Sequence, residues 1–251
     1  MLTRLGRPNA ARQRVVLLLC VIVCACSTTS TFPPAADATG KRHAPTERDF
    51  RPSDLLKSDI DIAAEVHLRE GLASTRLVME KLYRRNPREW RKGGSASIEA
   101  ALDHAFEPRM DLSFPELGGA RGADAILLAL KPEYGGDRVF AFGVGLASMV
   151  LLSYNGKTEF YLTDTLDAQK LYNAARNVEI AVWKLENARD AHGDLLLLTN
   201  EMTGVSNLSF EREFGKIIAY QDAMAQIAAQ RTNRTIRRAV QTLATAVFLP
   251  I

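Results

Sequence analysis

Residues 138–154 have the sequence RVFAFGVGLASMVLLSY, which is apolar on nearly every side of the helix that it predicts. Asn155 and Gly156 follow as a suitable helix stop. A helix that is apolar all round is either covered by other helices or inserted in a membrane. Because a membrane span needs about 20 apolar residues, this stretch is short for a span. Gly143 and Gly145 would allow close approach of neighbouring helices, so we predict a central core helix.

Around this stretch, the periodicity predicts amphipathic helices. Ser58 and Asp61 have the spacing of a capping box. The apolar stripe that follows steps by three and four residues through Ile60, Ala64, Leu68, Leu72, Thr75, Met79 and Leu82. At RRNPREW this helix should end, with Asn86 capping a second helix that has Pro87 at its first position and Glu89 at its third.

Three further features are expected downstream. Asp164 or Thr165 should start the longest helix, which would end near Gly193. Its apolar seam is formed by Leu171, Ala174, Val178, Ala181, Leu185 and Ala188. Residues 195–199, LLLLT, fit either a short strand or further helix. Another helix is expected from Phe210 to about Arg231, and a last apolar stripe runs through Ile236, Val240, Leu243 and Val247.

The first 25 residues have the three parts of a secretory signal peptide. Four arginines come before any acidic residue, residues 15–23 form an unbroken apolar run, and small and polar residues follow. Residues 26–53 are rich in Thr, Pro and Ala and show no helical or strand period, as in a flexible tether. The sequence therefore predicts a signal peptide over 1–25, a tether over 26–53 and one mainly α domain over 54–251. That domain is either a helical bundle or an irregular, repeat-like helical array.

Val23-Cys24-Ala25-Cys26 resembles the lipobox of bacterial lipoproteins, in which a small residue precedes the cysteine that is lipidated. The resemblance implies cleavage between Ala25 and Cys26, acyl chains such as palmitate on Cys26, and attachment to a membrane. Ser27 resembles the residue found in lipoproteins that are passed on to the outer membrane. We therefore expect a cell-envelope protein that is lipid-anchored and faces the periplasm.

Two weaker resemblances concern the body of the chain. STRLVMEKLYRRNPREW resembles the end of a tetratricopeptide-type helical hairpin, without a second copy at the period of roughly 34 residues. The segments EFYLTDTLDAQKLYNAARNVEIAVWKLENARD, NLSFEREFGKIIAYQD and NRTIRRAVQ resemble a group of uncharacterised proteobacterial envelope lipoproteins. This second resemblance implies an envelope location and a helical body, and it brings no activity or site residues.

The charge balance argues against nucleic acid as a partner. The chain has 32 basic and 29 acidic residues, but four of the basic residues and none of the acidic ones precede Cys26. The remainder therefore carries a formal charge of −1. Arg231, Arg234, Arg237 and Arg238 form a local basic cluster. They could contact phospholipid phosphates or an envelope protein, or they could pair with acids such as Glu211 or Asp222.

Candidates for chemistry are few. His67 and Glu70 share a helix face, and Asp190, His192 and Asp194 alternate near a turn. Neither group supplies the three or four ligands of a metal site, so we expect no metal and no cofactor. No familiar catalytic motif occurs, and the carboxylates of Glu211 and Glu213 are expected to face solvent.

Together these features favour a non-enzymatic, lipid-anchored scaffold or accessory protein with a partner in the envelope. One alternative is a binding module for a small or lipidic ligand, with the 138–154 helix lining an apolar cavity. An enzyme with an unrecognised site is a third possibility.

Overall fold

The apolar stretch forms helix α6, Arg138–Ser153, at the centre of a helical bundle. The computed structural model describes residues 52–106, 113–200, 208–233, 235–237 and 243–251. All of these belong to Phe50–Ile251, the second of two units into which the chain divides. Cys26 and the predicted cleavage site between Ala25 and Cys26 lie outside the described residues. The described residues are mainly α-helical, as expected, and contain no strand.

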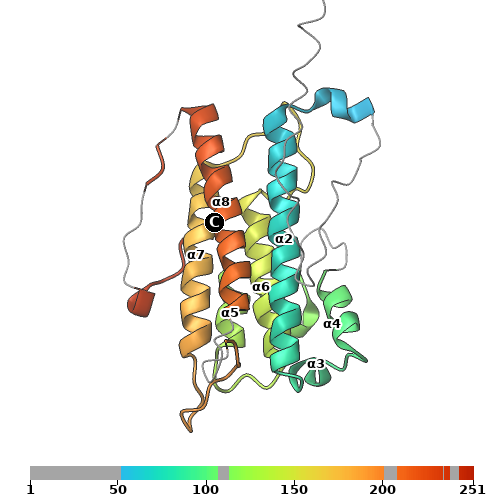
Figure 1. Cartoon of the computed structure of the whole chain (residues 1–251), viewed down its shortest axis with the longest axis vertical. Coiled ribbons are helices and arrows are strands. Elements are labelled where there is room, and N and C mark those ends of the chain that lie inside the picture. The colour runs from blue at the N-terminus through green and yellow to red at the C-terminus, as the bar shows by residue number, and fades with distance from the viewer. Residues whose placement is uncertain (1–51, 107–112, 201–207, 234, 238–242) are drawn as a thin grey trace, which may run out of the picture. The chain divides into compact units, whose positions relative to one another are not determined.

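Four long helices build the bundle: α2 (Asp59–Arg85), α6, α7 (Ala168–Asn187) and α8 (Ser209–Thr232). Shorter elements flank them: η1 (Pro52–Leu56), α3 (Glu89–Lys92), α4 (Ile98–Ala105), η2 (Pro115–Leu117), α5 (Gly122–Ala129) and η3 (Leu243–Thr245). Figure 1 shows the four long helices side by side, with α3, α4 and α5 gathered at one end. Each long helix packs on two others, in the order α2, α6, α7, α8 and back to α2.

Polar contacts at the helix ends show that consecutive long helices run in opposite directions. Asp61, at the start of α2, lies against Arg231, at the end of α8. Tyr83, near the end of α2, donates a hydrogen bond to Asp137, which caps the start of α6. The up-down-up-down order is a usual topology of four-helix bundles. Here residues 86–137, which carry α3, α4, η2 and α5, connect α2 to α6.

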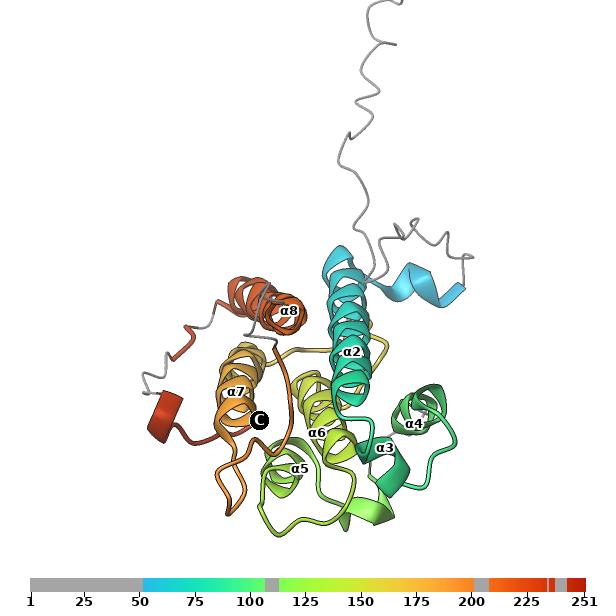
Figure 2. The ribbon, with the colours of Figure 1, turned by 60° about the horizontal axis from the view of Figure 1, so that its bottom comes forward.

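Other helices cover α6 on every side, which explains why its sequence has no polar face. Helices α2 and α7 pack on it within the bundle, and α5 covers its outer side (Figure 2). Its glycines are the points of closest approach. A Cβ atom added at Gly143 would lie 2.5 Å from Sδ of Met79, and one added at Gly145 would lie 2.6 Å from Cγ1 of Ile126. The predicted core helix is therefore confirmed.

The predicted start of α2 is confirmed. The Ser58 hydroxyl accepts a hydrogen bond from the Asp61 backbone N–H at 3.3 Å, and the Asp61 carboxylate accepts one from the Ser58 N–H at 2.8 Å. These reciprocal bonds satisfy two N–H groups that a helix start leaves open. The stop after α6 is also confirmed, since Asn155 and Gly156 both take the left-handed conformation.

The capping role predicted for Asn86 is wrong, because a distant segment uses its side chain. The Nδ2 group donates to the carbonyls of Leu82 and Leu198, each at 2.9 Å, and Oδ1 accepts from the Leu198 N–H at 2.8 Å. Asn86 therefore ends α2. Helix α3 begins only at Glu89, after a turn at Pro87, and has four residues.

The predicted start of α7 is three residues too early, and α2 is longer than α7. The Asp164 carboxylate binds Lys157 and the Tyr161 N–H, which holds it in the preceding turn. Asp167 caps α7 instead, by accepting a hydrogen bond from the Gln169 N–H at 2.8 Å. The helix ends at Asn187, and Gly193 takes its left-handed conformation in a later turn.

The segments after α7 and α8 are irregular. Residues 195–199 form neither a strand nor a helix, although Leu195 makes an isolated bridge with Arg189. The last apolar stripe forms no α-helix where it is described: residues 235–237 are irregular, and only Leu243–Thr245 form a 3₁₀ turn. Asn233 closes α8 in the left-handed conformation.

The C-terminal segment lies along α7, where a row of amide side chains holds it. Asn177 is fully buried; its Nδ2 donates to the Leu249 carbonyl at 2.8 Å, and its Oδ1 accepts from the Leu249 N–H at 2.6 Å. One turn earlier, Asn173 donates to the Pro250 carbonyl at 2.7 Å. Gln169, a further turn back, bonds the backbone of Arg237 in both directions. These bonds compete with a helix for the backbone of the segment.

Among the described helices, none combines the length and the apolar character that a membrane crossing requires.

Candidate functional site

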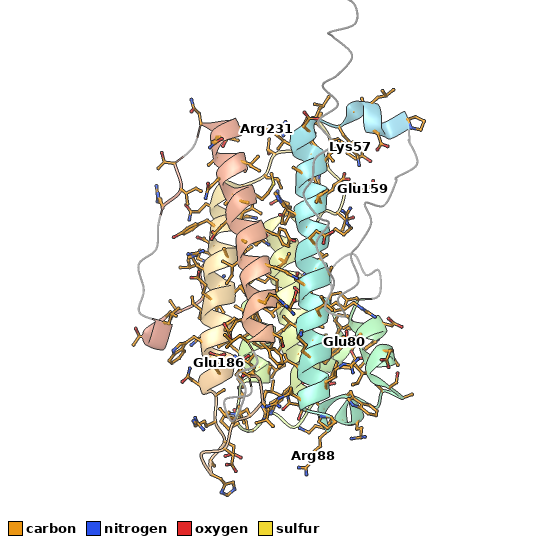
Figure 3. The ribbon with its side chains drawn as sticks, viewed as in Figure 1. Lys57, Glu80, Arg88, Glu159, Glu186 and Arg231 are labelled. Atoms are coloured by element: carbon orange, nitrogen blue, oxygen red, sulfur yellow. The ribbon has the colours of Figure 1, made fainter. Side chains whose placement is uncertain are left out.

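The strongest candidate for a functional site is an open groove of about 270 Å³ at the joint between α7 and α8. Its apolar lining consists of Val182, Trp183, Phe214, Ile218 and Leu243, and three carboxylates also line it: Glu179, Glu186 and Glu211. We call this feature the acidic groove. Figure 3 shows Glu186 at the end of the bundle opposite Lys57 and Arg231.

Helix periodicity creates the acidic groove from two matched faces. On α7, Glu179, Val182, Trp183 and Glu186 follow the steps of three and four that place side chains on one face of a helix. On α8, Glu211, Phe214, Gly215 and Ile218 repeat the same steps. A Cβ atom added at Gly215 would meet nothing within 4 Å, so the groove is open at that position.

The carboxyl groups of Glu186 and Glu211 meet in the groove. Nδ2 of Asn200 donates to both, at 3.0 Å to Glu186 and 2.9 Å to Glu211. Burial, followed by a hydrogen bond and charge repulsion from Glu211, raises the pKa of Glu186 to about 7. The repulsion acts because two carboxylates at one site cannot both ionise freely. The pair therefore holds a proton close to neutral pH.

The charge around the pair is uncompensated. Among the described residues, no lysine or arginine forms an ion pair with Glu186 or Glu211. Arg176 of α7 binds Glu179 at 3.2 Å and Asp222 at 2.5 Å. Burial raises the pKa of Glu179, and Arg176 opposes this shift. The acidic groove can thus accept a cation beside an apolar surface.

The arginine cluster is only partly described. Nη1 of Arg231 lies 3.4 Å from Oδ1 of Asp61, so Arg231 joins α8 to α2 and does not pair with Glu211 or Asp222. Arg237 is described through its backbone contacts with Gln169. Arg234 and Arg238 lie outside the described residues, so the proposed lipid or partner contact stays a prediction.

The histidines expected as incomplete metal sites are placed apart from the acidic groove. His67 packs beside the ring of Tyr220, with ring centroids 5.7 Å apart, and burial lowers its pKa. His192 lies in an exposed turn in which its N–H bonds the Asp190 carboxylate. Within the described part of the chain, no three histidine, cysteine or acidic side chains are grouped as a metal would need.

No local sequence pattern predicts the acidic groove, and the expectation for one of its neighbours, Glu213, is wrong. Glu213 is fully buried rather than solvent-facing, and its carboxylate pairs with Lys216 at 3.0 Å. Glu186 and Glu211 are 25 positions apart, and no local pattern links them. The groove residues of α7 and those of α8 have the same spacing in the sequence. This shared spacing predicts a common surface, but only once the two helices are known to be antiparallel.

Comparison of the chain with protein-family models, with curated proteins and with solved structures found no match.

Proposed function

We propose that this protein is a lipid-anchored, periplasm-facing scaffold or accessory protein of the bacterial envelope, and that the acidic groove receives a basic, apolar segment of a partner protein. The observation that carries the proposal is the acidic groove itself. It joins a half-buried apolar surface, with Leu243 exposed at its edge, to a carboxyl pair that has no cationic partner among the described residues.

The chemistry of the groove selects the kind of partner. Aromatic and branched apolar side chains at an interface gain from leaving water, and Trp183 offers the type of anchor that dominates binding energies. A lysine or arginine of the partner would meet Glu186 and Glu211, and its charge would favour release of their shared proton. A basic segment that carries apolar side chains satisfies both halves of the groove.

The anchor rests on the lipobox-like sequence that ends at Cys26, with Ser27 favouring the outer membrane. A second function, the binding of a small or lipidic ligand along α6, has less support. Met79 and Ile126 fill the space beside Gly143 and Gly145, so those positions of α6 are packed against side chains and line no hollow.

Site-specific photocrosslinking in the native envelope tests the groove. A photoreactive residue at Leu243, which is exposed at the edge of the groove, should capture a partner peptide that contains lysine or arginine beside apolar residues. The matched control places the same residue at Ala219, which is exposed on α8 and does not line the groove.

The double variant Glu186→Gln/Glu211→Gln then tests whether binding of the partner depends on the negative charge of these two carboxyl groups. We expect it to reduce the crosslink at Leu243 severalfold without changing the amount of protein in the membrane fraction. An unchanged crosslink in this variant, a captured peptide without basic residues, or equal capture at Ala219 would contradict the proposed role of the groove.

A further inference from the structure

The end of the bundle where the described chain begins carries an unusual number of exposed apolar side chains. Among the described residues, nine large hydrophobic side chains are exposed, and four of them lie at this end. They are Leu55 (75% exposed), Leu56 (59%), Leu162 (55%) and Ile62 (46%). We call this set the leucine end.

Backbone contacts fix the leucine end. Leu55 and Leu56 belong to η1, directly before α2, and Ile62 lies in the first turn of α2. The N–H of Leu162, in the connection between α6 and α7, donates to the carbonyl of Leu56 at 2.9 Å. Two segments that are about a hundred residues apart in the sequence are thereby held together, so the leucines are presented by an ordered surface.

Several charged groups around the leucines are paired with one another, whereas Asp59, in the first turn of α2, is exposed. Lys57 binds Glu65 at 2.5 Å and lies 3.9 Å from Asp54, and Arg231 pairs with Asp61. Figure 3 shows Lys57, Glu159 and Arg231 at this same end of the bundle. Paired charges lower the cost of bringing this surface into an environment that is less polar than water.

The length of the tether brings this end close to the anchor. Only the 25 residues 27–51 separate Cys26 from Pro52, the first described residue. A chain with the composition that the sequence analysis assigns to a tether has, at that length, a mean end-to-end distance of about 25–30 Å. Helix α2, with 27 residues, is about 40 Å long. The leucine end is therefore the part of the bundle that the tether keeps nearest to the bilayer.

We propose that the leucine end docks on the lipid bilayer, with Leu55, Leu56 and Leu162 entering the region between the headgroups and the acyl chains. This inference rests on the lipid anchor of the proposed function. The bilayer is the occupant that the geometry favours, because the tether holds it within reach of this surface. Docking would orient the bundle with the acidic groove, at the opposite end of α7 and α8, directed away from the membrane.

Depth-dependent quenching tests the inference on the full lipidated chain. The variants Leu56→Cys and Leu162→Cys each add one thiol to a chain whose Cys26 sulfur is expected to carry lipid. An environment-sensitive fluorophore on that thiol is compared in phosphatidylethanolamine–phosphatidylglycerol vesicles with and without brominated acyl chains. Arg88→Cys is the matched control, since Arg88 is exposed at the opposite end (Figure 3).

We expect the labels at positions 56 and 162 to lose fluorescence in brominated vesicles, because interfacial side chains reach the boundary of the acyl chains, while the label at 88 is unchanged. If the chain floats with the vesicles but positions 56 and 162 are quenched no more than 88, docking is overturned and the anchor stands. If the chain does not float with the vesicles, the anchor fails, and the docking that depends on it fails too.

Discussion

The carboxyl groups of Glu186 and Glu211 lie at the adjoining ends of α7 and α8 and share a single donor group, Nδ2 of Asn200. Neither carboxyl has an ion-pair partner among the described residues, so their mutual repulsion is relieved by a proton. Because the two residues belong to different helices, the protonation of this pair is coupled to how α7 and α8 meet. We therefore expect the stability of the joint that forms the acidic groove to depend on pH.

Glu186→Gln should change the pH dependence of stability. The pKa of Glu186 in the folded state, about 7, lies above the usual value of 4.5 for a glutamate. Between these values the folded state retains a proton that the unfolded state has lost, so this group makes stability fall as the pH rises. Glutamine removes the effect, and the variant should gain stability over wild type at about pH 8 and much less at about pH 5.

Urea unfolding at the two pH values measures the gain. Glu99→Gln, which removes an exposed carboxyl group on α4, is the control and should show no such difference. An equal effect of Glu186→Gln at both pH values would mean that the pair holds no shared proton.

Asp137 should be replaceable by asparagine and not by alanine. Its Oδ1 caps α6 by accepting from the Phe140 N–H at 2.9 Å, and its Oδ2 accepts from the Tyr83 hydroxyl at 2.8 Å. Alanine removes the cap and leaves a buried hydroxyl without a partner, at a cost of about 2–4 kcal/mol. Asparagine keeps the cap through Oδ1, and its Nδ2 can donate to the Tyr83 hydroxyl oxygen, which reverses the direction of the second bond. Because burial raises the pKa of Asp137 to about 6, little is lost with the charge. We expect a cost below about 1 kcal/mol. Similar unfolding free energies for the two variants would refute this role.

Two glycine-to-alanine variants should change stability in opposite directions. At Gly145 the added Cβ would lie 2.6 Å from Cγ1 of Ile126 and 2.9 Å from the carbonyl oxygen of Gly122, so α5 must move away from α6. We expect a loss of about 1–3 kcal/mol. At Gly71, in α2, the nearest atom is Cγ1 of Val150 at 3.6 Å, an ordinary contact. The helix preference of alanine should then give a gain of about 0.5–1 kcal/mol. Thermal or urea unfolding distinguishes the two signs, and stabilisation by Gly145→Ala would contradict the packing of α5 on α6.

Asn177→Ala should release the C-terminal segment from α7. The change removes both bonds to the Leu249 backbone from a fully buried position, at a cost of about 1–3 kcal/mol. Hydrogen exchange at the Leu249 amide should become much faster, since its acceptor is the Asn177 side chain. Asn187→Ala, which removes only a local bond to the Trp183 carbonyl, should leave that amide protected. Unchanged exchange in Asn177→Ala would contradict the attachment.

Helices whose caps and apolar stripes lie within one short stretch of sequence could be predicted from that stretch alone. The capping box at Ser58 predicts the start of α2, and the residues 138–154 predict a buried helix because no polar face is present. The seam from Leu171 to Leu185 is fully buried, as its spacing predicts. In each case the hydrophobic period or the cap is contained in one short stretch.

The predictions failed where a distant segment competes for a side chain or for the backbone. The residues around Asn86 are typical of a helix N-cap. However, its side-chain amide forms hydrogen bonds with the backbone N–H and carbonyl of Leu198 instead. The stripe from Ile236 to Val247 has a helical period, but Asn173 and Asn177 bind the backbone that follows it. The acidic groove was missed for the same reason, since it exists only after α7 and α8 have packed.

Both proposals depend on the attachment of the chain to a bilayer through Cys26, and the intact mass of the protein in the membrane fraction tests this most directly. The account predicts that the wild-type chain begins at Cys26 and carries the added mass of glyceryl and acyl groups. Cys26→Ala should lack that mass and leave the membrane fraction or retain its leader. If wild type and Cys26→Ala show the same unlipidated mass in the membrane fraction, the anchor is refuted.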